Sequence, residues 1–174
     1  RPAIAAGFVK RQGQDELFDA IFTRAEPRAV LTGMRGSGKT QLAATVATRC
    51  EEEGWPLVTW INAASRKELI ADLYELALRT SINTTKDVPP ETIIQRFLDQ
   101  LRSADAADRL FVFDNVENLD DLKDLIPEGK DIRITITTTR HLDWDSLGWN
   151  PITVGVFERD QSISLLCERS GDTH

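Results

Sequence analysis

The chain has 174 residues, 41% of them hydrophobic, and this size predicts a single α/β domain built around one core. No run approaches the roughly 18 apolar residues that suggest a membrane-spanning helix. The formal net charge of −7 argues against a nucleic-acid-binding face in this segment, because binding to phosphate backbones needs concentrated basic residues. The sequence begins at Arg1 rather than Met, so we expect it to be part of a longer protein.

Short apolar segments alternate with amphipathic ones along the chain, which predicts a parallel sheet covered by helices on both faces. Strands are predicted at residues 28–32, 57–61, 109–114, 132–137 and 151–154, the last of them shorter than the others. Helices are predicted after the first strand, after a capping box of Ser65 and Glu68, from Pro90, and over residues 119–125.

The cysteines and tryptophans are assigned structural roles. Cys50 continues the apolar stripe of the helix after the first strand, which predicts a buried free thiol, and the low cysteine content fits a reducing cytoplasm. Trp60 is predicted to lie in the core. Trp144 and Trp149 flank a polar loop and are expected to face a helical subdomain that follows in the chain or, as the alternative, a partner.

Residues 33–40, Gly-Met-Arg-Gly-Ser-Gly-Lys-Thr, fit the phosphate-loop pattern G-x-x-x-x-G-K-[ST]. The loop joins a predicted strand to a predicted helix, so backbone N–H groups and a positive helix end converge on one point. Lys39 is expected to reach the β- and γ-phosphates, and Thr40 to place its hydroxyl on Mg²⁺. The sequence therefore predicts a site for a nucleoside triphosphate or diphosphate.

The predicted fold is that of a three-layer P-loop NTPase, with a mainly parallel five-stranded sheet in the order 5-1-4-3-2. The loop residues expected to bind the nucleotide are Gly33, Arg35, Gly36, Ser37, Gly38, Lys39, Thr40 and Gln41.

Asp114 ends the third predicted strand, where four apolar residues give way to a charge. Ligands gather at the carboxyl ends of strands in open α/β sheets, so Asp114 is predicted to contact Mg²⁺ directly or through water. The alternative is a strand-terminating Asp that caps the next helix. Asn115 follows where many related ATPases carry a carboxylate; an amide orients water but accepts no proton, which predicts slow hydrolysis. Glu117 is a possible substitute whose direction the sequence does not give.

Arg140 ends the fourth predicted strand after three threonines, Thr137 to Thr139. In the expected topology this strand lies between the first and third, so its end faces the γ-phosphate. A planar guanidinium binds two oxygens together, which favours Arg140 as a sensor of the terminal phosphate. The alternative is a surface arginine at a strand end.

These residues together resemble the nucleotide-binding domain of the STAND signal-transducing ATPases, of the NB-ARC type and its bacterial branch. The resemblance rests on residues 8–11 with 16–17, 33–43, 60–63, 111–115 and 138–140. The first of these segments resembles the one that packs against adenine, which implies adenine contacts for Phe8, Val9 and Arg11. Lys10 replaces the usual Gly there, and Arg35 and Ser37 stand where Gly and a β-branched residue are commoner.

The resemblance implies a nucleotide domain over residues 1–157 and the start of a truncated helical subdomain over 158–174. It also implies a switch: a closed ADP-bound monomer opens on exchange for ATP and assembles into an oligomer. The catalytic positions would be Lys39, Asp114, Asn115 and Arg140, with Mg²⁺ held by Thr40 and Asp114. The implied partners are the other domains of the longer chain, namely the helical subdomain, C-terminal repeats and an effector domain.

The sequence leaves three alternative functions open. A small-molecule kinase would share the phosphate loop, but no arginine-rich lid segment is visible. A nucleotide-driven motor on DNA conflicts with the acidic charge balance. A nucleotide-binding scaffold without hydrolysis is compatible with Asn115.

Overall fold

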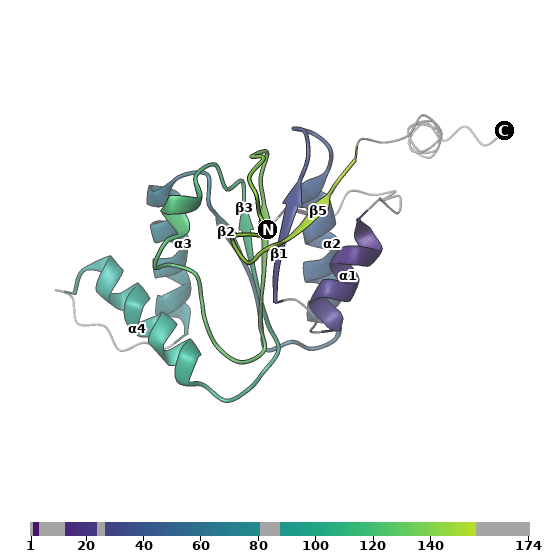
Figure 1. Cartoon of the computed structure of the whole chain (residues 1–174). Helices are drawn as coiled ribbons and strands as arrows, with labels where there is room; N and C mark the ends of the chain where they lie inside the picture. Colours follow the sequence, from purple (N-terminus) through teal and green to yellow (C-terminus); the bar gives the residue numbers. More distant parts are fainter. Residues whose placement is uncertain (1, 4–12, 24–26, 81–87, 156–174) are drawn as a thin grey trace.

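The central sheet has five parallel strands in the spatial order β2-β3-β4-β1-β5 (Figure 1). The computed structural model describes residues 2–3, 13–23, 27–80 and 88–155. The strands are β1 (Arg28–Thr32), β2 (Leu57–Asn62), β3 (Arg109–Asp114), β4 (Ile132–Thr137) and β5 (Asn150–Thr153). Every neighbouring pair runs parallel, so the predicted order is confirmed.

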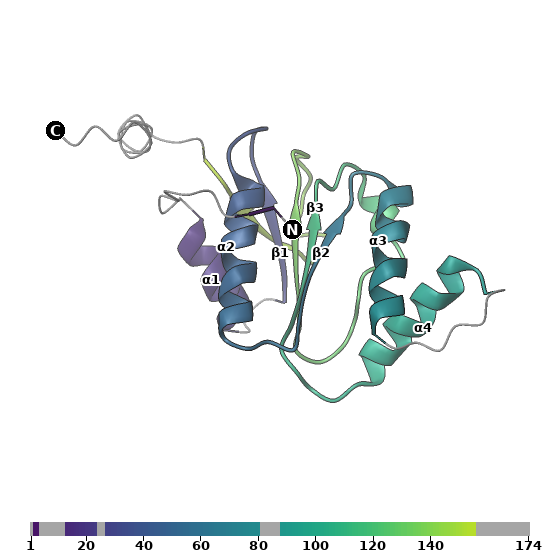
Figure 2. The same cartoon turned by 180° about the vertical axis from the view of Figure 1, so that it is seen from behind.

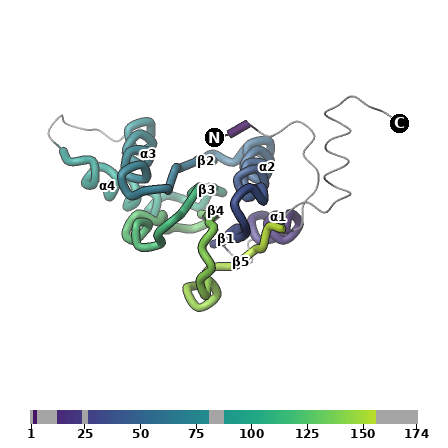
Figure 3. Tube along the Cα trace, turned by 90° about the horizontal axis from the view of Figure 1, so that it is seen from above, coloured from purple at the N-terminus to yellow at the C-terminus, as the bar shows by residue number. Residues whose placement is uncertain are grey.

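Helices cover both faces of this sheet. On one face lie α1 (Gln14–Phe22) and α2 (Lys39–Glu52), and on the other lie α3 (Arg66–Arg79) and α4 (Pro90–Ser103). A short 3₁₀ helix, η1 (Leu119–Leu122), lies beside α3. The view from behind in Figure 2 and the view from above in Figure 3 show the same three layers, with α1 and α2 separated from α3 and α4 by the sheet.

The strands alternate their side chains between two apolar cores, one on each face. In β3, Leu110 and Val112 pack with α1 and α2, whereas Phe111 and Phe113 pack with α3 and α4. The central strands β3, β4 and β1 are almost entirely buried, as a parallel sheet with helices on both sides requires, whereas the edge strands β2 and β5 are only partly buried.

The predicted helix starts are confirmed, and one predicted helix is wrong. The Ser65 side chain accepts a hydrogen bond of 3.3 Å from the backbone N–H of Glu68, and Pro90 is the first residue of α4. The segment predicted as a helix over residues 119–125 is only the single 3₁₀ turn of η1. Asp124 has a φ of 64°, a left-handed conformation that no α-helix continues through.

Helix α1 has no counterpart among the predicted elements. Its last turn is fixed by Arg133, a buried side chain of β4 whose Nε donates to the carbonyl oxygen of Ile21 at 3.2 Å. Asp108 and Asp131 lie 3.6 Å and 3.9 Å from the same guanidinium and balance its charge. A cation at the carboxyl end of a helix also interacts favourably with the helix dipole.

Trp144 and Trp149 are buried in the core, so the expectation that they face a following subdomain is wrong. Their exposed fractions are 3% and 4%, and both pack in the cluster beneath α3 and α4. The connection from β4 to β5 must cross β1, which lies between those strands. This crossover contains no helix, so the two indole rings supply its apolar contact with the sheet. Trp60 is half-buried and packs against the core on the opposite face.

Cys50 is fully buried on α2, which confirms the predicted buried thiol. Burial, and to a smaller extent the nearby carboxylates of Glu53 and Asp108, raise the pKa of the Cys50 thiol to about 12. The thiol is therefore neutral and unreactive in the folded domain at neutral pH.

Among the helices in the described ranges, none is both long and apolar enough to cross a bilayer. The helical subdomain expected over residues 158–174 lies outside the described residues.

Candidate nucleotide-binding site

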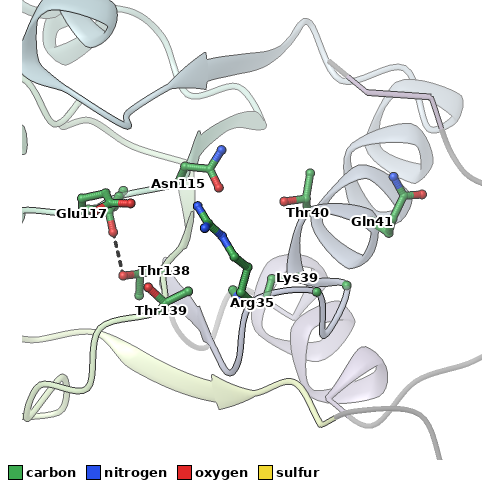
Figure 4. A pocket seen from close by; sticks show the side chains of 11 residues that line it. Arg35, Lys39, Thr40, Gln41, Asn115, Glu117, Thr138 and Thr139 are labelled. Carbon is green, nitrogen blue, oxygen red and sulfur yellow. Dashed lines mark hydrogen bonds between the residues drawn. The ribbon is translucent and has the colours of Figure 1, made fainter.

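A pocket of about 510 Å³ opens at the carboxyl ends of β3 and β4, facing the loop that leads into α2 (Figure 4). One wall is the loop and the first turn of α2, and the other wall is the chain that follows β3 and β4. The lining residues are Arg35, Gly36, Gly38, Lys39, Thr40, Gln41, Asn115, Val116, Glu117, Thr138 and Thr139. Most of the predicted phosphate loop and the residue after Asp114 therefore line one cavity.

The loop needs glycine at the points where its backbone turns. Gly36 and Gly38 have φ values of 80° and 89°, in the left-handed region that side chains disfavour. Gly33 has a φ of 143°, and a Cβ atom there would lie 2.5 Å from the carbonyl oxygen of Val154. The loop is also closed internally by a hydrogen bond of 3.2 Å from the Ser37 N–H to the Met34 carbonyl.

Lys39 holds the loop from inside. Its Nζ donates to the carbonyl oxygens of Gly33 at 2.9 Å and Met34 at 2.8 Å, and only 8% of the residue is exposed. Burial lowers the pKa of Lys39, and the negative charge of Asp114 partly offsets that effect. A phosphate bound beside the ammonium would favour its charged form, so we expect a bound nucleotide to raise the pKa of Lys39.

One carboxylate oxygen of Asp114, at the end of β3, connects the start of α2 to the end of β4. Its Oδ1 accepts hydrogen bonds from the Thr40 hydroxyl at 2.9 Å and from the Thr137 hydroxyl. The Thr137 oxygen in turn accepts a hydrogen bond of 2.9 Å from the Asn115 N–H. The carboxylate, 7% exposed, is thereby held toward the first turn of α2.

The Thr40 and Asp114 oxygens fit a magnesium site that is completed by a nucleotide. Hard oxygen ligands suit Mg²⁺, which commonly uses one or two carboxylates together with substrate phosphates and water. Across the described residues, no cluster of three or more His, Cys, Asp or Glu side chains could enclose a metal ion. The donor set therefore suits a metal that arrives with phosphate ligands.

Asn115 and Glu117 lie on the pocket wall opposite Lys39 and Thr40, and both are exposed (Figure 4). Asn115 has a φ of 63°, a left-handed conformation that asparagine tolerates better than most residues. The structure thus supplies the direction that the sequence left open: Glu117 borders the cavity.

Arg140 does not line this pocket. Its Nε donates to the carbonyl oxygen of Glu117 at 2.9 Å, and its side chain borders a neighbouring cavity of about 460 Å³ together with Leu142 and Trp144. Thr138 and Thr139, which precede it, do line the first pocket, and Thr138 donates to the carbonyl of Val116 at 2.7 Å. Sequence reasoning named Arg140 as the sensor and gave these hydroxyls no binding role, although the run of three threonines was visible.

The predicted adenine contacts Phe8, Val9 and Arg11 lie outside the described residues. On the side of the pocket nearest the N-terminal segment, Gln41 donates from Nε2 to the carbonyl of Ala3 at 3.3 Å.

Comparison with protein families matches residues 11–174 to the NB-ARC domain. The chain belongs to the NB-ARC family. The match covers nearly all of the chain, including the phosphate loop, Asp114 and the threonines after β4. No curated protein matches this NB-ARC domain.

Solved structures show the same fold for this NB-ARC domain. Cdc6p from Pyrobaculum aerophilum is 16% identical, with a TM-score of 0.62 over 97% of this chain and 52% of its own. The ORC2 protein of Aeropyrum pernix is 15% identical, with a TM-score of 0.58 over 97% of this chain and 55% of its own. DnaA from Aquifex aeolicus bound to AMPPCP is 15% identical, with a TM-score of 0.53 over 96% of this chain and 55% of its own. The chain therefore has a P-loop NTPase fold and spans about half the length of these structures.

Glycine substitutions test the loop of the NB-ARC domain. Gly33→Ala places a Cβ against the Val154 carbonyl in a strained backbone conformation, so we expect the free energy of unfolding to fall by at least ~2 kcal/mol. Gly36→Ala has no atom within 4 Å of the added Cβ and should lose only ~1 kcal/mol for its left-handed φ. Urea denaturation measures both, and equal losses would contradict the packing argument.

Proposed function

We propose that this domain is the ATP- and ADP-binding switch of a STAND signalling ATPase in the cytoplasm. The observation that carries the proposal is a pocket lined by Lys39 and Thr40, in which the Thr40 hydroxyl is hydrogen-bonded to the Asp114 carboxylate. The NB-ARC match supports an ATPase family. The sequence contains no guanine-reading Asn-Lys-x-Asp element, which favours adenine.

The roles of the residues follow from their positions. The Lys39 ammonium would neutralise the β- and γ-phosphate oxygens, and the N–H groups at the start of α2 would receive the inner phosphate. Thr40 and Asp114 would hold Mg²⁺, which screens phosphate charge when it is bound. Arg140 stays a predicted γ-phosphate sensor, although its guanidinium would first have to leave the Glu117 carbonyl.

Hydrolysis is proposed to be slow because the residue after Asp114 is an amide. Asn115 would orient water, while Glu117 is the carboxylate among the residues that line the pocket and would accept its proton. Slow turnover suits a switch, since the ATP-bound state then lasts long enough to assemble.

Nucleotide titration tests the site. Calorimetry of the full-length protein with Mg²⁺ should show binding of ADP and ATP but not GTP. Lys39→Ala should weaken adenine-nucleotide binding at least ~10-fold, because it removes charge-assisted hydrogen bonds to phosphate. Lys67→Ala, on the exposed side of α3, should bind like the wild type. Equal binding by wild type and Lys39→Ala would rule out this pocket as the nucleotide site.

Phosphate release tests the hydrolysis proposal. Glu117→Gln should lower the ATPase rate constant by ~100-fold and leave ATP affinity within ~3-fold, since a general base contributes to the reaction rather than to binding. Glu75→Gln, an exposed residue of α3, is the matched control. If the wild type binds ATP without releasing phosphate, the protein is a nucleotide-binding scaffold instead.

Assembly is the proposed output of the switch. Light scattering of the full-length protein should give a larger oligomeric fraction with a non-hydrolysable ATP analogue than with ADP, because a coupling of about 1–3 kcal/mol per site biases such an equilibrium. Lys39→Ala should stay monomeric with either nucleotide. A mass that is independent of nucleotide would contradict the switch.

A further inference from the structure

We propose that Arg35, an arginine inside the phosphate loop, reads the γ-phosphate and so sets the preference for ATP over ADP. The proposal rests on the proposed nucleotide site and adds to it the residue that distinguishes the two ligands. It assigns to Arg35 the discrimination that the sequence pattern assigned to Arg140.

The position of Arg35 brings its charge into the pocket. It lies at the exposed apex of the loop, between Gly33 and Gly36, and its side chain extends from the loop into the space bordered by Asn115 and Thr139 (Figure 4). Lys39 and Thr40 border the inner side of that space. A phosphate chain held by the first turn of α2 would therefore place its outermost group between Arg35 and the ends of β3 and β4.

The guanidinium of Arg35 is available for a ligand. It makes no hydrogen bond or ion pair with another residue in the described part of the chain. Arg140 differs from Arg35 in its bonding and in its position. Its Nε donates a hydrogen bond to the Glu117 carbonyl, and its side chain borders the neighbouring cavity. Of the two arginines, only Arg35 can contact a phosphate in this pocket without first breaking an internal bond.

The chemistry of the contact explains why it would be selective. A guanidinium presents parallel N–H donors that match two oxygens of one phosphate, and it stays charged at all accessible pH values. ADP ends one phosphate earlier, so it leaves the fork of Arg35 in solvent. A group that contacts ATP alone supplies the differential affinity that any ligand-driven change of state requires.

Paired titrations of the full-length protein test the proposal. The ligands are ADP and AMPPCP, whose methylene bridge prevents turnover during the measurement. Arg35→Gln should weaken AMPPCP binding ~10–100-fold, the loss expected for charged hydrogen bonds to phosphate, and change ADP binding by less than ~3-fold. The AMPPCP affinity of Arg35→Lys should lie between those of the wild type and Arg35→Gln, since lysine keeps the positive charge but lacks the paired N–H donors of the guanidinium. Arg96→Gln, on the exposed face of α4, controls for the loss of a positive charge.

The outcomes separate this proposal from the one on which it rests. An unchanged ratio of AMPPCP to ADP affinity in Arg35→Gln, with binding still dependent on Lys39, overturns the role of Arg35 alone. A fall in that ratio in Arg140→Gln but not in Arg35→Gln assigns the reading to Arg140. Equal loss of both ligands in a folded Arg35→Gln protein shows that the arginine supports the loop rather than reading the γ-phosphate. Absence of nucleotide binding by the wild type overturns both proposals.

Discussion

One carboxylate oxygen organises the candidate site. Oδ1 of Asp114 accepts hydrogen bonds from Thr40 at the start of α2 and from Thr137 at the end of β4. A nearly buried carboxylate is costly unless its oxygens are hydrogen-bonded, so these two hydroxyls are needed for Asp114 to remain where it is. The backbone carbonyl of Asp114 also accepts a hydrogen bond of 2.8 Å from Ala63, just beyond β2. The distance between the phosphate loop and the opposite wall is therefore set by the sheet itself.

The pocket is bordered by positive charge although the chain as a whole is negatively charged. The formal net charge is −7, yet Lys39 and Arg35 border the cavity from one side. Concentrated positive charge in a concave site attracts anions even when the protein as a whole repels them. The lowered pKa of Lys39 shows that its burial is unfavourable to the charged form, and a bound anion would offset that effect.

The sequence predicted the sheet well, because most of its strands are short runs rich in apolar and β-branched residues. Strand β2, for example, ends at Asn62, one residue later than predicted. Helix α1 was not predicted because it spans only nine residues and no side chain caps its start, and because its docking depends on the distant Arg133. The burial of Trp144 and Trp149 depends on a crossover without a helix, which no local pattern reveals. For the site, the loop and Asp114 were found by motif, whereas the direction of Arg140 depends on a backbone carbonyl that no motif encodes.

The edge strand β5 ties the end of the described domain to its ligand loop. The Val154 N–H donates to the carbonyl of Thr32 at 2.8 Å, and Gly33 has no room for a Cβ against the Val154 carbonyl. Gly13, ahead of α1, is equally close to β5, because a Cβ there would lie 2.8 Å from Ile152. A displacement of the backbone at Val154 would therefore act directly on Thr32 and Gly33, where the phosphate loop begins. Strand β5 and the start of the phosphate loop would then shift as one unit, so the carboxyl end of the described domain is mechanically coupled to the loop.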